Sequence, residues 1–201
     1  IFAGSYHGIF DEVIVRGTRK LHSVPAAPGI LRNTAEHVLV LDYGDPASLD
    51  IIRQRAGEIA ALLVEPVQSR RPDLQPREFL QELRRITAAS GSLLIFDEVV
   101  TGFRLGMGCA QGYFGVTPDL TVLGKAVAGG YPMAGGVGGR ADVMAVYGSG
   151  LDGKSGAHIQ VGGTLSANPL SCAAGVFAIE EMARTNAPVI AGRAGDRLTA
   201  G

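Results

Sequence analysis

The sequence has few charged residues, few cysteines and no long apolar run, and each shortage excludes a class of protein. Charged residues make up 18% of the 201, and the formal net charge of −1 leaves no basic surface for non-specific nucleic-acid binding. No apolar run approaches the roughly 20 residues that span a bilayer. An apolar content of 46% nevertheless suffices for a folded core. We therefore expect a folded cytoplasmic protein with no nucleic-acid or membrane partner.

Cysteine and histidine are scarce as well. The two cysteines, Cys109 and Cys172, form no C-x-x-C pair, which argues against a disulfide scaffold and against a zinc site. We expect both to pack as small apolar residues. Neither H-E-x-x-H nor G-x-S-x-G occurs, so a metalloprotease or a serine hydrolase is not indicated. The four histidines lie far apart in the sequence, at His7, His22, His37 and His158. We expect no metal site.

Glycine, by contrast, is abundant and concentrated. Of the 29 glycines, 18 fall between Gly102 and Gly163, interleaved with apolar segments such as LTVLGKAV that flexible linkers lack. This stretch is expected to be an ordered region in which backbone approaches a ligand. The first residues, IFAGSYHG, fit the end of a strand, and the last, DRLTAG, lie inside a helical pattern. We therefore expect a fragment of a larger domain.

Short apolar runs rich in β-formers alternate with helical patterns along the chain. The runs cover residues 37–43, 61–67, 93–99 and 120–124. Helices are predicted from Asp45 and Pro46 to Ala56, from Pro76 to Ser90 with Gly91 just beyond, and from Pro169 to Arg184. This alternation predicts an α/β fold, a mostly parallel sheet with helices on both faces, whose ligands bind beyond the carboxyl ends of the strands.

Charged residues stand at or near the ends of three of these apolar runs. They are Glu65, Asp97 with Glu98, and Lys125. Such groups are costly to bury unless a charged partner or a ligand receives them, and a structural ion pair between Asp97 and Lys125 is the simplest interpretation.

The sequence matches two nucleotide-binding motifs only in part. A phosphate loop ending at Gly124-Lys125 would need glycine where Asp119 stands, and Gly136-x-Gly138-x-x-Ala141 lacks the acidic residue expected about 20 positions later.

Pyridoxal phosphate chemistry uses both charged residues at once. The cofactor needs a lysine that forms an imine with its aldehyde and a carboxylate that keeps its ring nitrogen protonated. Asp97 and Lys125 lie 28 residues apart, which is enough for neighbouring strand ends to present both to one crevice.

Five ordered strings then resemble the class III, omega-type aminotransferases of fold type I. They are IFAGSYHG, LLVEPVQ, LLIFDEVVTGFR, PDLTVLGKAVAGGYPMAGGVGG and GGTLSANPLSCAAG, and together they cover essentially the whole chain. The resemblance implies pyridoxal 5'-phosphate as cofactor, Lys125 as the Schiff-base lysine that also moves the substrate proton, and Asp97 as the partner of the ring nitrogen. It also implies that Val99 presses on one ring face.

Further cofactor-binding residues come from the same resemblance. Tyr6 is similar to the aromatic residue stacked on the other ring face, and His7 beside it supports that turn. Glu65, after the second apolar run, is included with them. Thr164 resembles the threonine that reaches the cofactor phosphate of the neighbouring subunit, which implies a homodimer.

The sequence also departs from the family's pattern. Arg70 stands where several relatives have a glutamate that pairs with a substrate-binding arginine, so Arg70 becomes a substrate-binding candidate for an anionic group. Val100 replaces a glutamine that touches the ring hydroxyl in some relatives. The upstream phosphate cup and the C-terminal small domain of the family fall outside the sequence. Residues 1–201 are therefore predicted to be a partial cofactor-binding large domain.

The resemblance implies amino transfer between a small-molecule amino donor and a carbonyl acceptor. The stretch EPVQSRRPDLQPREFLQELRR is similar to aminotransferase modules of polyketide and nonribosomal peptide assembly, whose acceptor is bound to a carrier protein. The sequence is also similar to glutamate-1-semialdehyde 2,1-aminomutase, which exchanges groups within one substrate. A cofactor-free scaffold of the same fold is a third hypothesis, although it would be expected to lack Lys125 or Asp97.

Overall fold

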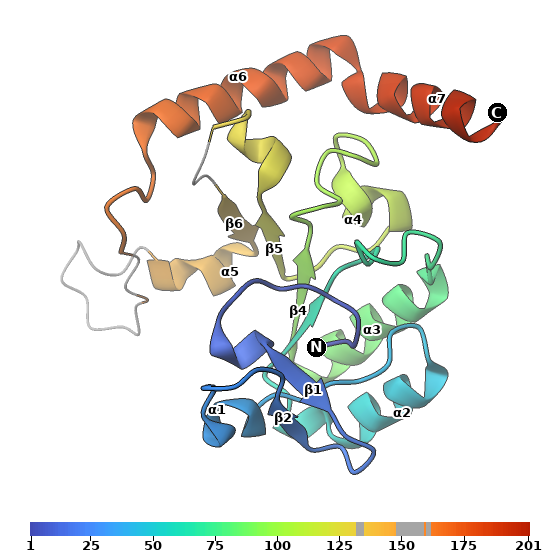
Figure 1. Cartoon of the computed structure of the whole chain (residues 1–201), viewed down its shortest axis with the longest axis vertical. Coiled ribbons are helices and arrows are strands. Elements are labelled where there is room, and N and C mark those ends of the chain that lie inside the picture. Colours follow the sequence, from blue (N-terminus) through green and yellow to red (C-terminus); the bar gives the residue numbers. More distant parts are fainter. Residues whose placement is uncertain (132–134, 148–158, 160–161) are drawn as a thin grey trace. The chain divides into compact units, whose positions relative to one another are not determined.

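The computed structural model describes residues 1–131, 135–147, 159 and 162–201 (Figure 1). The chain divides into two compact units, Ile1–Asp97 and Glu98–Gly201, which are treated separately below. His158 lies outside the described residues.

A parallel strand pair forms the centre of the first unit. Strand β3 (Ala61–Val64) pairs with β4 (Leu93–Asp97) in a register that sets Ala61 opposite Leu93 and Val64 opposite Phe96. Leu62, Val64, Leu94 and Phe96 are all at most 4% exposed. The two apolar runs are therefore strands, as the sequence predicts, each ending two or three residues earlier than its apolar run.

The helices of this unit begin and end close to the start and stop residues predicted from the sequence. Helix α2 (Pro46–Gln54) begins at Asp45, whose side chain accepts a hydrogen bond from the Ala47 N–H. Helix α3 (Arg77–Ser90) ends at Gly91, which has φ of 80°. It buries its apolar stripe against β4 and α2. The buried residues of that stripe are Phe79, Leu80, Leu83 and Ile86.

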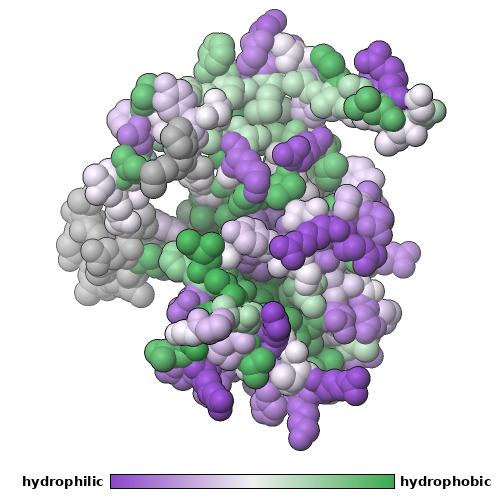
Figure 2. All heavy atoms as spheres, viewed as in Figure 1, coloured by the Kyte–Doolittle hydropathy of each residue, from purple (hydrophilic) through white to green (hydrophobic). Residues whose placement is uncertain are grey.

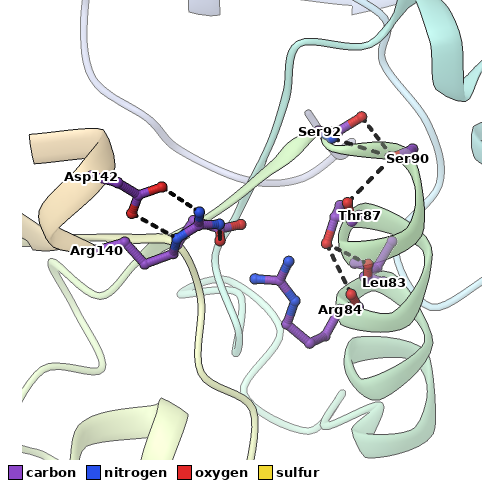
Figure 3. Close-up of polar contacts among 8 residues, drawn as sticks. Leu83, Arg84, Thr87, Ser90, Ser92, Arg140 and Asp142 are labelled. Carbon is purple, nitrogen blue, oxygen red and sulfur yellow. Dashed lines mark hydrogen bonds and ion pairs between the residues drawn. The ribbon is translucent and has the colours of Figure 1, made fainter.

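A chain of hydroxyl groups closes the end of α3 (Figure 3). The Thr87 hydroxyl donates to the Leu83 carbonyl at 2.9 Å, and the Ser90 hydroxyl lies 2.9 Å from that of Ser92. Ser92 in turn donates to the Ile59 carbonyl at 2.7 Å, next to the start of β3. These bonds fix where the chain enters β4.

The rest of the first unit consists of short helices and strands. They are the 3-10 helices η1 (Asp11–Val13) and η2 (Ala56–Glu58), the antiparallel strands β1 (Val15–Gly17) and β2 (Ser23–Pro25), and helix α1 (Arg32–Glu36).

The strand predicted over 37–43 is wrong in extent. Only an isolated parallel bridge, Phe2 to Leu41, forms there. The Leu41 N–H donates to the Ile1 carbonyl, and the Leu41 carbonyl accepts from the Ala3 N–H. The Ile1 amino group also donates to the Leu39 carbonyl at 2.9 Å, and the pairing extends no further along the run.

The second unit holds an antiparallel strand pair. Strand β5 (Leu120–Leu123) pairs with β6 (Gly136–Gly139), and Leu123 lies opposite Gly136. The glycines of the suspected dinucleotide fingerprint thus lie within a strand rather than in a strand-to-helix turn. At Gly139 the reason for glycine is close packing, because a Cβ there would lie 2.3 Å from the Asp119 carbonyl.

Helices and short turns complete this unit. They are α4 (Cys109–Phe114), η3 (Lys125–Ala128), α5 (Ala141–Met144), η4 (Ala145–Tyr147), α6 (Pro169–Thr185) and α7 (Ala187–Thr199). Arg140, just before α5, binds Asp142 and the buried Asp119; its bonds to Asp142 are drawn in Figure 3.

Helix α6 packs tightly on the turn that begins with Lys125. A Cβ at Gly175 would lie 2.4 Å from the Val127 carbonyl, and a Cβ at Gly129 would lie 2.4 Å from the Ala174 carbonyl. Two glycines therefore allow the backbones of η3 and α6 to meet.

Helices α6 and α7 also carry large exposed apolar side chains among hydrophilic ones (Figure 2). These side chains include Leu170, Val176, Phe177, Ile190 and Leu198. Within the described ranges, no helix is both long and apolar enough to cross a bilayer.

Candidate active site

Two buried side chains hold the turn that carries Tyr6. Glu65, 3% exposed after β3, accepts a hydrogen bond from the Tyr6 N–H at 3.0 Å. Gln68 donates to the Ala3 carbonyl at 2.7 Å and to the Ser5 hydroxyl at 2.9 Å. The chain thus places the buried Glu65 carboxylate against the backbone of this turn.

The Tyr6 ring is presented outward by this turn. Tyr6 is 55% exposed, while its backbone N–H is bound by the buried Glu65. An aromatic ring in such a position offers a flat face to a planar ligand.

The next residue, His7, meets Asp97. The imidazole Nδ1 lies 2.8 Å from the Asp97 Oδ2, and the two side chains are 2% and 11% exposed. Asp97 is the last residue of β4. The sequence predicted Asp97 as a site residue from its position after an apolar run, but nothing in the sequence indicated that His7, 90 residues earlier, pairs with it.

In the second unit, Glu98 is fully buried, and its carboxylate accepts four hydrogen bonds. Its carboxylate accepts from the Thr101 hydroxyl at 2.9 Å and from the backbone N–H groups of Ala110 and Gln111 at 2.6 and 3.1 Å. The Gln111 side-chain amide adds a fourth donor at 3.2 Å. Glu98 therefore ties the segment after β4 to the start of α4, a role that sequence reasoning missed.

Val99 and Lys125 lie at neighbouring turns of this unit. A Cβ at Gly124 would approach Val99 Cγ1 to 3.2 Å, so glycine lets the Val99 side chain pack against the residue before Lys125. Lys125 itself is exposed and has φ of 48°. A non-glycine residue in this left-handed conformation costs of order 1–3 kcal/mol, and such strain concentrates at functional sites.

Two further sequence candidates are exposed. Thr164 lies in the turn before α6, and Arg70 follows the strand-end segment of β3. Arg71, next to it, is paired with Asp73 at 2.9 Å, whereas no ion pair involves Arg70 within the described part of the chain.

The cysteines differ from the sequence expectation in one case. Cys109 is buried, as predicted, and burial raises the pKa of its thiol. Cys172 is exposed on α6 and does not pack as a core residue. Across the described residues, no cluster of three or more histidine, cysteine or acidic side chains could hold a metal ion.

Comparison with known proteins identifies the class of fold and then the family. The chain is similar to an omega-transaminase from Sphaerobacter thermophilus, with a TM-score of 0.78, 37% identity, and coverage of 90% of this chain and 42% of that one. It is also similar to a glutamate-1-semialdehyde-aminomutase from Pseudomonas aeruginosa in complex with PMP, with a TM-score of 0.68, 30% identity, and coverage of 89% and 40%. The α/β, fold type I architecture predicted from the sequence is confirmed.

The family follows from the sequence itself. The family model for class III aminotransferases matches residues 2–201, so the chain belongs to the class III aminotransferase family. Its relatives include the glutamate-1-semialdehyde 2,1-aminomutases of Caldivirga maquilingensis, 40% identical over 98% of this chain and 45% of that one, and of Bacillus subtilis, 43% identical over 90% and 41%. The chain therefore spans less than half the length of these relatives.

Proposed function

We propose that the protein carrying this chain transfers an amino group between an amino donor and a carbonyl acceptor with pyridoxal 5'-phosphate as cofactor. The observation that carries the proposal is the buried pair of His7 and Asp97 at the end of β4. Family membership supports it, and a solved relative with a TM-score of 0.77 and 34% identity is a transaminase with PLP bound.

The residues of each unit fit this cofactor. Asp97 offers an anionic carboxylate, the group that pairs with a protonated pyridine nitrogen, and the Tyr6 ring offers an exposed aromatic face. In the other unit, Lys125 offers an exposed amine on a strained turn, with Val99 packed beside Gly124. When bound, pyridoxal phosphate supplies a ring that withdraws electrons from the carbon bearing the amino group.

Each residue then has a defined task. Asp97 would hold the proton on the ring nitrogen, and Lys125 would bind the cofactor aldehyde and carry the proton to and from the substrate carbon. Tyr6 and Val99 would each contact one face of the ring. Glu65 acts through the Tyr6 backbone that it binds.

Two roles concern groups beyond one copy of this chain. Thr164 binds the cofactor phosphate of a second copy, so the active enzyme is a homodimer. Arg70, exposed and adjacent to the strand-end segment, binds an anionic group of the substrate. These residues form part of the cofactor-binding large domain, and the phosphate cup and the small domain of the family would complete the enzyme.

Covalent labelling of the full-length protein tests the proposal. Borohydride reduces the lysine-to-cofactor bond to a stable amine, and peptide mapping then locates the labelled lysine. We expect the label on Lys125 and its loss in Lys125→Ala, whereas Lys20→Ala, which removes an exposed lysine of the other unit, should leave it unchanged. Label on Lys20 or Lys154 would reject the assignment, and no label on any lysine would favour a cofactor-free scaffold.

A second candidate function is glutamate-1-semialdehyde 2,1-aminomutase. The names of the relatives from Caldivirga maquilingensis and Bacillus subtilis favour it. An aminomutase converts one substrate without an added amino donor, so incubation of the enzyme with glutamate-1-semialdehyde alone, and separately with donor and acceptor pairs, distinguishes the two. Acceptors bound to a carrier protein belong in the second set.

A further inference from the structure

His7 and Asp97 form a buried, hydrogen-bonded pair within the first compact unit. Both side chains are close to fully buried, and the 2.8 Å separation between Nδ1 and Oδ2 is that of a charge-assisted hydrogen bond. The turn that presents His7 is itself fixed, because the N–H of the preceding Tyr6 binds the buried Glu65. The imidazole therefore reaches Asp97 from a backbone with little freedom to move.

The contact also specifies which nitrogen carries the proton. An ionised carboxylate has no proton to give, so Nδ1 must be the donor. The other nitrogen, Nε2, is buried and has no hydrogen-bond partner among the described residues. A proton on Nε2 would be a buried donor with no acceptor, which costs more than a bare lone pair there. The arrangement therefore favours the tautomer with the proton on Nδ1.

We propose that His7 is a positioning residue for Asp97: its Nδ1–H fixes the plane of the carboxylate that meets the cofactor ring nitrogen. This inference rests on the proposed function, which assigns that nitrogen to Asp97. It differs from a role in supporting the Tyr6 turn, because a turn support would act on any bound ring, whereas a positioning residue acts only on a ring that has a nitrogen to meet the carboxylate.

Cofactor affinity separates these roles in the full-length protein. The probes are pyridoxal phosphate and its benzene analogue, in which carbon replaces the ring nitrogen. We expect His7→Phe to weaken binding of pyridoxal phosphate by about tenfold or more, as for the loss of one charge-assisted bond, and to change binding of the analogue little. His22→Phe, which alters an exposed histidine of the same unit, should change neither.

Two milder variants keep the test valid if His7→Phe folds poorly. In His7→Asn the side-chain amide nitrogen stands near the place of Nδ1, and in His7→Gln it stands near that of Nε2. Asparagine should therefore restore much of the affinity for pyridoxal phosphate and glutamine should not. The melting temperature of each variant, measured without cofactor, reports its folding separately.

A second readout needs no cofactor. Nitrogen-15 spectra of the full-length protein labelled at histidine, with His7 assigned from the spectrum of His7→Gln, report the tautomer directly. We expect a protonated Nδ1 and an unprotonated Nε2. The reverse tautomer would overturn the inference.

The binding data distinguish failure of this inference from failure of the proposed function. If the wild-type protein prefers pyridoxal phosphate to the analogue but His7→Phe weakens both equally, the positioning role is wrong and the function of Asp97 stands. If the wild-type protein binds both equally, Asp97 does not meet the ring nitrogen, and both proposals are overturned.

Discussion

At the scale of single residues, three buried carboxylates follow the strands, and their donors differ in kind. Glu65 accepts from backbone N–H groups of Tyr6 and Ser69, and Glu98 accepts from two backbone N–H groups, a hydroxyl and an amide. Both carboxylates therefore hold backbone segments in place. Asp97 alone of the three is bound by an imidazole. This partner distinguishes Asp97 from the two carboxylates that hold backbone.

Replacing Asp97 by asparagine tests this distinction. Asparagine keeps the shape of the side chain but loses the negative charge, so the variant should still bind the cofactor while the rate of substrate α-proton exchange falls by about 100-fold or more. Exchange can be followed by NMR in deuterated water. The matched control is Asp73→Asn, an exposed aspartate that binds Arg71, which should exchange at the wild-type rate. An exchange rate near wild type in Asp97→Asn would refute the role.

Arg70 gives a residue-scale prediction about substrate choice. If its exposed guanidinium binds an anionic group, Arg70→Ala should lower kcat/KM for an anionic substrate by about 1.5 to 3 kcal/mol of transition-state stabilisation and affect a neutral amine much less. Arg71→Ala is the control, because the Arg71 guanidinium is already paired with Asp73. Equal losses for both substrates, or no loss, would leave Arg70 as a solvated surface residue.

The sequence predicted some of these residues and not others for a physical reason. Asp97 and Lys125 stand out because a charge directly after a buried apolar run is visible in one dimension. The role of Glu98 is not visible, because two of its donors are backbone N–H groups 12 and 13 residues later, which any residue type supplies. The partner of Asp97 is 90 residues away and is revealed only by folding.

At the scale of elements, the capping residues and prolines at helix starts predicted helices better than apolar runs predicted strands. Helices α2, α3 and α6 follow their Asp-Pro, Pro and Asn-Pro starts closely, because a cap and the first turn are local interactions. The run over 37–43 had the composition of a strand, yet a strand exists only where another segment takes its hydrogen bonds. Within the described chain only Leu41 forms a bridge, and Leu39 adds one hydrogen bond from the Ile1 amino group.

The contact of α6 with η3 provides an element-scale prediction. Gly175→Ala places a methyl group 2.4 Å from the Val127 carbonyl, so backbone must shift, and we expect destabilisation by about 1–3 kcal/mol. Because Val127 lies two residues after Lys125, cofactor binding should weaken too. Urea unfolding and cofactor titration of the full-length protein measure the two effects.

Gly192→Ala on α7 is the matched control for this substitution. A Cβ there meets nothing within 4 Å, and alanine favours helix by about 0.5–1 kcal/mol, so stability should hold or rise. A Gly175→Ala protein as stable as the control would show that the helix moves freely on the turn.

At the scale of the whole molecule, the family could be predicted from the sequence because several of its motifs occur in the expected order along the chain. Five strings, each weak alone, recur in the order that a class III aminotransferase requires, and the family match over residues 2–201 confirms them. Substrate choice was not readable in this way. The resemblance to aminotransferases and to aminomutases rests on the same proposed cofactor-binding residues, and the chain spans less than half the length of its relatives.

The last prediction concerns association, and it follows from the proposal that Lys125 and Thr164 of different copies meet at each site. Lys125→Ala and Thr164→Val homodimers should each be defective in full-length form. In a heterodimer of the two, one site combines the lysine of one protomer with the threonine of the other and is intact, while the second site carries both defects. Random exchange of subunits should therefore restore about a quarter of wild-type activity. If Thr164 acts within its own chain, every site in the mixture keeps one defect, and mixing restores nothing.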